Sequence, residues 1–152
     1  GPDINSDGLD RIIDYLSNSP RLSNWDEATE LIKRMFAQVN CESEDDWREL
    51  ARNTFREETD GSIRYNWDTK IVEPMKKGVP IPDLWPLFRS LRQVPVLAFR
   101  GELSDILKPN TFARMGEENP EMTAVTVPGV GHVPNLREET SRKALHDFLD
   151  RL

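Results

Sequence analysis

The sequence predicts an α/β fold in which a largely helical region precedes two parallel β-strands. Residues 94–100 (VPVLAFR) and 123–127 (TAVTV) are apolar, β-branched runs, and a glycine-containing turn follows each of them. Buried parallel strands have this composition. Between the two runs, Pro109 stands where a helix can begin, and residues 109–119 have a length that suits the crossover helix of one βαβ unit.

The first part of the chain has the apolar spacing of amphipathic helices. Leucine and isoleucine within residues 9–16 mark a short helix. Asn24, with an acid three residues later, predicts the start of a second helix over residues 24–39. Ser43 and the acidic residues after it predict the start of a third helix, whose apolar face continues through Phe55.

The remaining segments are a connection and two further helices. Asp83 can cap a helix that continues to about Leu91, and apolar residues within 144–152 predict a final amphipathic helix. Residues 60–82 predict an irregular connection, because glycine and proline interrupt them at Gly61, Pro74, Gly78, Pro80 and Pro82.

Two titratable side chains follow the predicted strands. Asp105 comes after the first strand and His132 after the second. Because ligands of open α/β sheets bind beyond the carboxyl ends of the strands, we expect these side chains to lie close together. Gly129 and Gly131 permit the tight turn that would present an imidazole at this edge. Glu102 is an alternative acid, since its carboxylate also follows the first strand.

Simpler interpretations of these residues remain open. Either acid can accept backbone N–H bonds in a turn, and His132 can fill a loop. The other histidine, His146, lies within the predicted last helix, where we expect it to be a surface residue.

The sequences around the two candidate residues carry a family resemblance. Residues 101–107 (GELSDIL) resemble the loop after the seventh strand of the α/β-hydrolase superfamily, and residues 127–134 (VPGVGHVP) resemble the loop after the eighth. Residues 65–68 and 83–88 are similar to segments of the cap and of the helix before the seventh strand in bacterial members. The resemblance implies the C-terminal part of an α/β-hydrolase fold, two parallel strands with flanking helices preceded by a helical cap.

The same resemblance implies a division of the chain and a role for each candidate residue. Residues 1–82 would be a helical cap or lid region, and residues 83–152 a C-terminal segment of the hydrolase core. Asp105 would be the acid and His132 the base of a catalytic triad, with Asp105 preferred to Glu102 because of its place in the family pattern. The expected substrate is an ester, a lactone or a similar carbonyl compound.

The sequence lacks the third member of such a triad. No Gly-x-Ser-x-Gly motif occurs. Four serines are considered as the nucleophile, and each lies at a predicted helix start or in a turn: Ser23, Ser43, Ser62 and Ser104. We therefore expect this chain alone to be inactive, with the nucleophile on a segment outside it. A truncated, non-catalytic interaction module and an inactive fragment are the alternatives.

Composition excludes several other classes of function. The formal net charge of −7 disfavours nucleic acid as a partner, because phosphate binding relies on clustered Lys and Arg. Cys41 is the only cysteine, so no internal disulfide can form, and no apolar run approaches the roughly 20 residues of a membrane helix. We expect a soluble cytoplasmic protein without metal or cofactor. Its expected partners are a small-molecule substrate in the intact enzyme and either an N-terminal hydrolase segment or a second copy of the chain, paired at the sheet edge.

Overall fold

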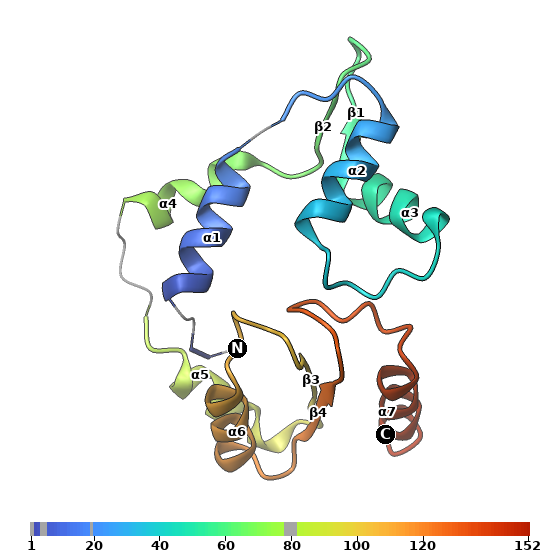
Figure 1. The fold of residues 1–152 in the computed structure, drawn as a ribbon. Coiled ribbons are helices and arrows are strands. Elements are labelled where there is room, and N and C mark those ends of the chain that lie inside the picture. The colour runs from blue at the N-terminus through green and yellow to red at the C-terminus, as the bar shows by residue number, and fades with distance from the viewer. Residues whose placement is uncertain (1, 4–5, 19, 78–81) are drawn as a thin grey trace. The chain divides into compact units, whose positions relative to one another are not determined.

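The computed structural model of the chain describes residues 2–3, 6–18, 20–77 and 82–152, which form two compact units. One unit comprises residues 1–9, 38–40 and 81–152, and is called the sheet unit here; the other comprises residues 10–37 and 41–80, and is called the helical unit. In chain order (Figure 1) the elements are α1 (Ser6–Ser17), α2 (Trp25–Met35), α3 (Glu44–Thr54), β1 (Phe55–Glu57), β2 (Ile63–Tyr65), the 3₁₀ helix η1 (Thr69–Val72), α4 (Glu73–Lys76), α5 (Trp85–Arg89), the 3₁₀ helix η2 (Ser90–Gln93), β3 (Leu97–Gly101), α6 (Pro109–Glu118), β4 (Thr123–Val127) and α7 (Glu139–Leu149).

Two predicted helix starts in the helical unit are confirmed by their capping contacts. The Asn24 side chain accepts the Glu27 N–H at 2.9 Å, directly before α2. Ser43 and Asp46 form a reciprocal capping box at the start of α3. Such caps satisfy N–H groups that have no partner within the helix. Helix α2 ends at Met35, four residues before the predicted end of the apolar face at residue 39.

A short β-hairpin corrects the prediction for the end of α3 and for the segment after it. Helix α3 ends at Thr54, and Phe55 begins β1, which pairs with β2 in antiparallel register from Phe55↔Tyr65 to Glu57↔Ile63. The turn between the strands is built by Gly61, with φ +78°, and by Asp60, whose Oδ1 accepts the Ser62 N–H at 2.9 Å. Turn contacts of this kind close a β-hairpin. The prediction of an irregular connection, which rested on glycine and proline alone, was therefore wrong for the segment that contains β2.

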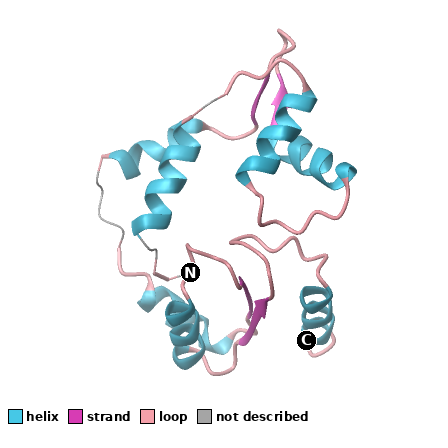
Figure 2. Cartoon of the chain, viewed as in Figure 1, coloured by secondary structure: helices cyan, strands magenta, loops and turns pink. Residues whose placement is uncertain are grey.

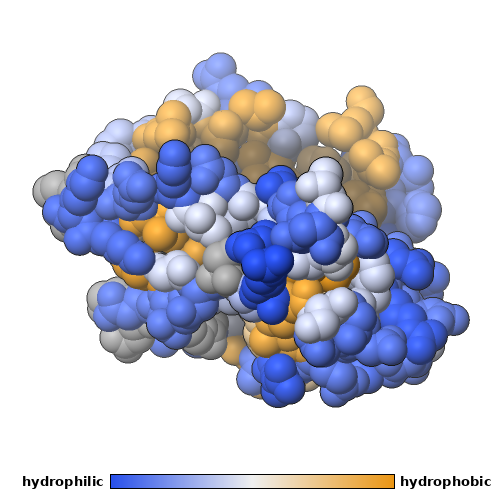
Figure 3. All heavy atoms as spheres, turned by 90° about the horizontal axis from the view of Figure 1, so that it is seen from above, coloured by the Kyte–Doolittle hydropathy of each residue, from blue (hydrophilic) through white to orange (hydrophobic). Residues whose placement is uncertain are grey.

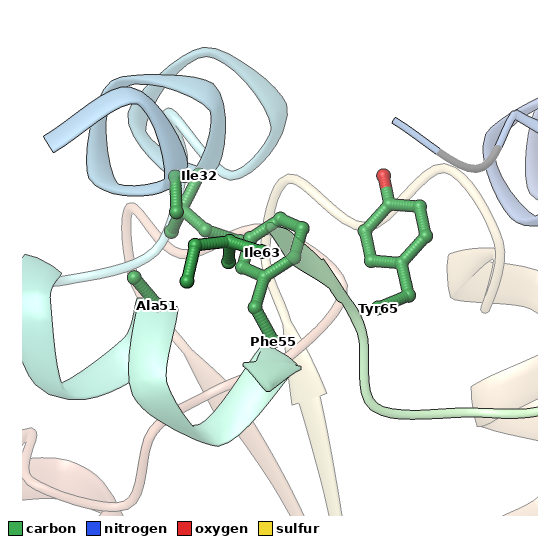
Figure 4. Packing of buried hydrophobic residues seen from close by; sticks show 6 residues of the cluster. Ile32, Ala51, Phe55, Ile63 and Tyr65 are labelled. Carbon is green, nitrogen blue, oxygen red and sulfur yellow. The ribbon is translucent and has the colours of Figure 1, made fainter. Parts of the chain in front are cut away.

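The hairpin and the two helices enclose one apolar core. Figure 4 shows Ile32 of α2 and Ala51 of α3 close to Phe55 and Ile63 of the hairpin. Phe55 also stacks on Tyr65, with ring centroids 4.9 Å apart. Burial of these side chains stabilises the helical unit independently of any catalytic role. None of the described helices has both the length and the apolar composition that a membrane crossing requires.

The sheet unit contains the predicted βαβ arrangement. Strands β3 and β4 are parallel, in register from Leu97↔Thr123 to Gly101↔Val127, and α6 lies between them in the chain, as predicted (Figure 2). Strand β3 begins three residues later than the predicted run, because the 3₁₀ helix η2 ends at Gln93 and Pro95 has no N–H for a ladder.

The helices of the sheet unit start or end at slightly different residues from those predicted. Asp83 accepts the Trp85 N–H at 2.9 Å at the start of α5, and η2 extends that helical segment to Gln93. Helix α7 runs from Glu139 to Leu149 and contains the predicted apolar residues Ala144, Leu145, Phe148 and Leu149, whereas Leu152 lies beyond its end. The buried apolar cluster of this unit combines residues of α5, α6 and the segments beside the strands: Trp85, Phe88, Leu107, Phe112, Met115 and Met122.

The helical unit ends near the predicted boundary at residue 82, but compactness alone assigns no role to it. The division into a cap region (1–82) and a core segment (83–152) therefore stays a prediction.

Close backbone contact fixes the ends of the two parallel strands. A Cβ atom on Gly101 would lie 1.7 Å from the carbonyl oxygen of Gly131 and 2.6 Å from that of Val130. On Gly131, a Cβ would lie 2.9 Å from the Cβ of Gln38. A side chain at Gly101 would push the segments that follow β3 and β4 apart, so glycine is required there, whereas a side chain at Gly131 would force Gln38 to shift.

We predict that Gly101→Ala destabilises the chain, by about 1–3 kcal/mol, because the new methyl group overlaps backbone atoms that cannot rotate away. Gly116→Ala is the matched control. Gly116 lies within α6, and a methyl group added there would meet nothing within 4 Å, so that substitution should stabilise the helix by about 0.5–1 kcal/mol. Urea denaturation of the three proteins measures both changes. Equal midpoints for Gly101→Ala and the unmodified chain would contradict the contact.

Candidate active site

Two loops follow the parallel strands: the β3 loop, residues 102–108, and the β4 loop, residues 128–138. Backbone hydrogen bonds join them beyond the strand ends. The Glu102 N–H donates to the Val127 carbonyl and the Leu103 N–H donates to the Val130 carbonyl, both at 2.9 Å. The pairing of β3 with β4 is thereby continued into the segments that contain the candidate residues.

The alternative acid, Glu102, takes part in the turn of the β4 loop. Its Oε2 accepts the Gly129 N–H at 2.8 Å. Gly129 has φ +67°, a left-handed conformation that glycine adopts without strain. Glu102 thus accepts a backbone N–H in a turn, which is the simpler of the two roles considered for this acid from the sequence.

A buried arginine shapes the β3 loop from within. Arg100 is 6% exposed, and its Nε–H donates to the Leu107 carbonyl at 2.8 Å. Its Nη2 donates to the carbonyls of Glu102, at 3.0 Å, and Ser104, at 3.4 Å. One guanidinium therefore satisfies three backbone acceptors, which is the geometry that five fixed donors make possible. This role was not predicted from the sequence. The available signal was the position of Arg100, a charged residue at the end of an otherwise apolar predicted strand.

Ser104 contacts the candidate histidine directly. Its Oγ lies 3.0 Å from Nδ1 of His132, and the same oxygen accepts the Leu107 N–H at 3.1 Å. Ser104 is 5% exposed, whereas His132 is exposed. From the sequence, Ser104 was interpreted only as a turn serine and this contact was missed, although its position next to Asp105 in the strand-following loop was a signal.

Asp105 and His132 follow the carboxyl ends of adjacent parallel strands, as predicted. Asp105 is partly buried and comes directly after Ser104 in the β3 loop. The β4 loop, which contains His132, is also joined to residues 38–40: the Gly131 N–H donates to the Gln38 carbonyl at 2.8 Å, and the Asn135 side chain donates to the Asn40 carbonyl. The structure thus brings together the two loops that carry these residues.

The second histidine of the sequence lies outside these two loops. His146 is exposed on α7. Over the described parts of the chain, no group of three or more His, Cys, Asp or Glu residues is arranged to hold a metal ion.

The chain is similar to hydrolases in sequence. It is 29% identical to a 3-hydroxybutyrate-oligomer hydrolase of Cupriavidus necator over 145 residues, which cover 90% of this chain and 49% of the relative. It is 30% identical to a 2-(acetamidomethylene)succinate hydrolase of Mesorhizobium japonicum over 92 residues, which cover 60% of this chain and 32% of the relative. The chain thus spans half or less of the length of these relatives. No family model matches it.

The fold agrees with these likenesses. A crystal structure of an α/β-hydrolase from Novosphingobium aromaticivorans DSM 12444 superimposes with a TM-score of 0.87 at 33% identity, and the match covers 100% of this chain and 54% of that one. The parallel βαβ unit, its flanking helices and the similarity to hydrolases in both sequence and structure show that the chain has part of an α/β-hydrolase fold and resembles members of that superfamily.

Proposed function

We propose that this chain supplies the acid and the base of a carbonyl hydrolase, with Asp105 as the acid and His132 as the base. The nucleophile and the oxyanion donors would belong to a segment outside these 152 residues. The observation that carries the proposal is the anchoring of His132 Nδ1 at the β3 loop while the side chain stays exposed beyond the end of β4. A base at a strand end needs this combination of a fixed ring and an accessible nitrogen.

The orientation of the imidazole assigns a task to each ring nitrogen. Nδ1 is directed to Ser104, so Nε2, on the far side of the ring, is the nitrogen that would accept the proton of the nucleophile. Asp105 would stabilise the imidazolium that forms. The activated nucleophile would attack the carbonyl carbon of an ester, a lactone or a similar compound, and water would then release the acyl group and regenerate the enzyme.

Exposed apolar side chains near the two candidate residues support a missing segment. Leu103, beside Ser104, is 48% exposed, and Val133, beside His132, is 53% exposed. Leu136, farther along the β4 loop, is 42% exposed. Figure 3 shows apolar residues (orange) at the surface between hydrophilic ones (blue). Exposed apolar side chains beside candidate site residues are typical of a surface that a further segment or a substrate covers.

Two further parts of the proposal concern the chain as a whole. Residues 1–82 would act as the cap over the substrate, which is supported by the resemblance of residues 65–68 to cap segments and by the separate core of the helical unit. The cytoplasm is the proposed compartment. Cys41 is the single cysteine of the sequence, so an oxidising compartment would give the protein no internal disulfide.

We predict that the purified chain hydrolyses a short-chain aryl ester no faster than its His132→Ala variant. A base without a nucleophile and without oxyanion donors has no covalent route to assist. Initial rates for both proteins at equal concentration test this expectation. A clear loss of rate in the variant would mean that a nucleophile within the chain has been overlooked, and Ser104 would be the first residue to replace.

A second prediction separates the two acids. In the enzyme reconstituted with a nucleophile-bearing N-terminal hydrolase segment, Asp105→Asn should lower kcat/KM by about 10³-fold or more, since the amide cannot stabilise the imidazolium. Glu102→Gln is the matched control, because the amide oxygen can still accept the Gly129 N–H, and its kcat/KM should stay within about threefold. The reverse ranking would make Glu102 the acid.

A further inference from the structure

We propose that Ser104 is a positioning residue for His132: its hydroxyl holds Nδ1 and so directs Nε2 away from the β3 loop, toward the place that the nucleophile would occupy. The inference rests on the proposed function and adds a residue to it. The carrying observation is the 3.0 Å separation between Ser104 Oγ and His132 Nδ1, made by a serine that is 5% exposed.

The serine can position the ring because its own place is fixed on two sides. The Leu107 N–H donates to Ser104 Oγ at 3.1 Å, which restricts rotation of the hydroxyl-bearing side chain. The Arg100 guanidinium donates to the carbonyls of Ser104 and Leu107, at 3.4 Å and 2.8 Å. Ser104 therefore belongs to a loop whose shape is fixed by the buried Arg100 side chain of β3. Residues that are locked in place by their neighbours position functional groups most accurately.

A hydroxyl suits this position because its oxygen has two acceptor lone pairs. For Nε2 to act as the base, neutral His132 must hold its proton on Nδ1, and the hydroxyl accepts this Nδ1–H with the lone pair that Leu107 does not occupy. The bond therefore persists when Nε2 takes up a proton and the ring becomes an imidazolium. A methyl group at the same position makes neither contact.

Ser104 and Asp105 would act on different properties of the histidine. A neutral hydroxyl adds little to the stability of the imidazolium charge, whereas a carboxylate adds much more. Loss of Ser104 should consequently affect the orientation and the tautomer of the ring, and kcat through them. Substrate binding, and thus KM, should stay unchanged because Ser104 is only 5% exposed and its hydroxyl is therefore not available to the substrate.

The first test uses the unmodified chain and needs no activity. Long-range ¹H–¹⁵N spectra distinguish the two ring nitrogens of each histidine, and the sequence contains only His132 and His146. His146 is exposed on α7 and serves as the internal reference. We expect neutral His132 to hold its proton mainly on Nδ1, so that Nε2 can accept one, in contrast to a mixture of tautomers for His146. Identical tautomer ratios for the two histidines would overturn the proposal, whether or not any variant folds.

Variants then assign the effect to the hydroxyl. Ser104→Ala should bring the nitrogen shifts of His132 close to those of His146, while Ser104→Thr, which keeps the hydroxyl, should retain the pattern of the unmodified chain. Ser90→Ala is the matched control, because Ser90 is an exposed serine whose Oγ donates to the Leu87 carbonyl. Unchanged His132 shifts in a folded Ser104→Ala protein would show that Ser104 does not hold the ring.

Kinetics of the reconstituted enzyme separate this inference from the proposed function. We expect Ser104→Ala to lower kcat about tenfold with KM unchanged, and Ser104→Thr to recover most of the loss. If His132→Ala abolishes activity while Ser104→Ala leaves kcat intact, the positioning role is wrong and the proposed function stands. If Ser104→Ala alters the ring nitrogens while His132→Ala leaves activity unchanged, the proposed function is wrong.

Discussion

The close approach of Gly101 to Gly131 is the constraint on which the candidate site depends. No Cβ fits at Gly101, because it would lie 1.7 Å from a backbone oxygen of the β4 loop. The absence of a side chain allows the Leu103 N–H to reach the Val130 carbonyl, and the two loops continue the pairing of β3 and β4. Asp105 and His132 belong to loops that this contact holds together, so the arrangement of the two loops depends on backbone shape before it depends on the chemistry of these side chains.

Arg100 complements that contact from the interior of the sheet unit. Its guanidinium is buried, and it donates three hydrogen bonds to backbone carbonyls of the β3 loop. Hydrogen bonds from a charged donor are stronger than neutral ones, and a buried charge without them would be costly. The consequence is a loop whose carbonyls turn inward to the arginine and whose Ser104 hydroxyl turns toward the histidine. Strand, loop and imidazole thus form one connected arrangement.

Sequence reasoning was most accurate where a local rule had one structural solution. Strand β4 matches its predicted bounds, and the starts of α2 and α3 follow from the caps at Asn24 and Ser43. The hairpin at Phe55 was missed because helical spacing and strand propensity overlap at an aromatic residue, and tertiary packing decides between them. The contacts of Arg100 and Ser104 were missed for a different reason. They join residues through the folded loop, and no periodicity of the chain encodes them.

The central claim is that His132 is the base of a hydrolase and that its Nε2 is directed at a nucleophile from another segment. The most direct measurement is a crystal structure of the reconstituted enzyme at a resolution that defines the imidazole orientation. The account predicts His132 Nε2 within about 2.6–3.2 Å of the nucleophile's reactive atom, with Nδ1 still at the β3 loop beside Ser104. A nucleophile that lies beyond the reach of His132, or an imidazole turned so that Nε2 faces the β3 loop, would contradict it.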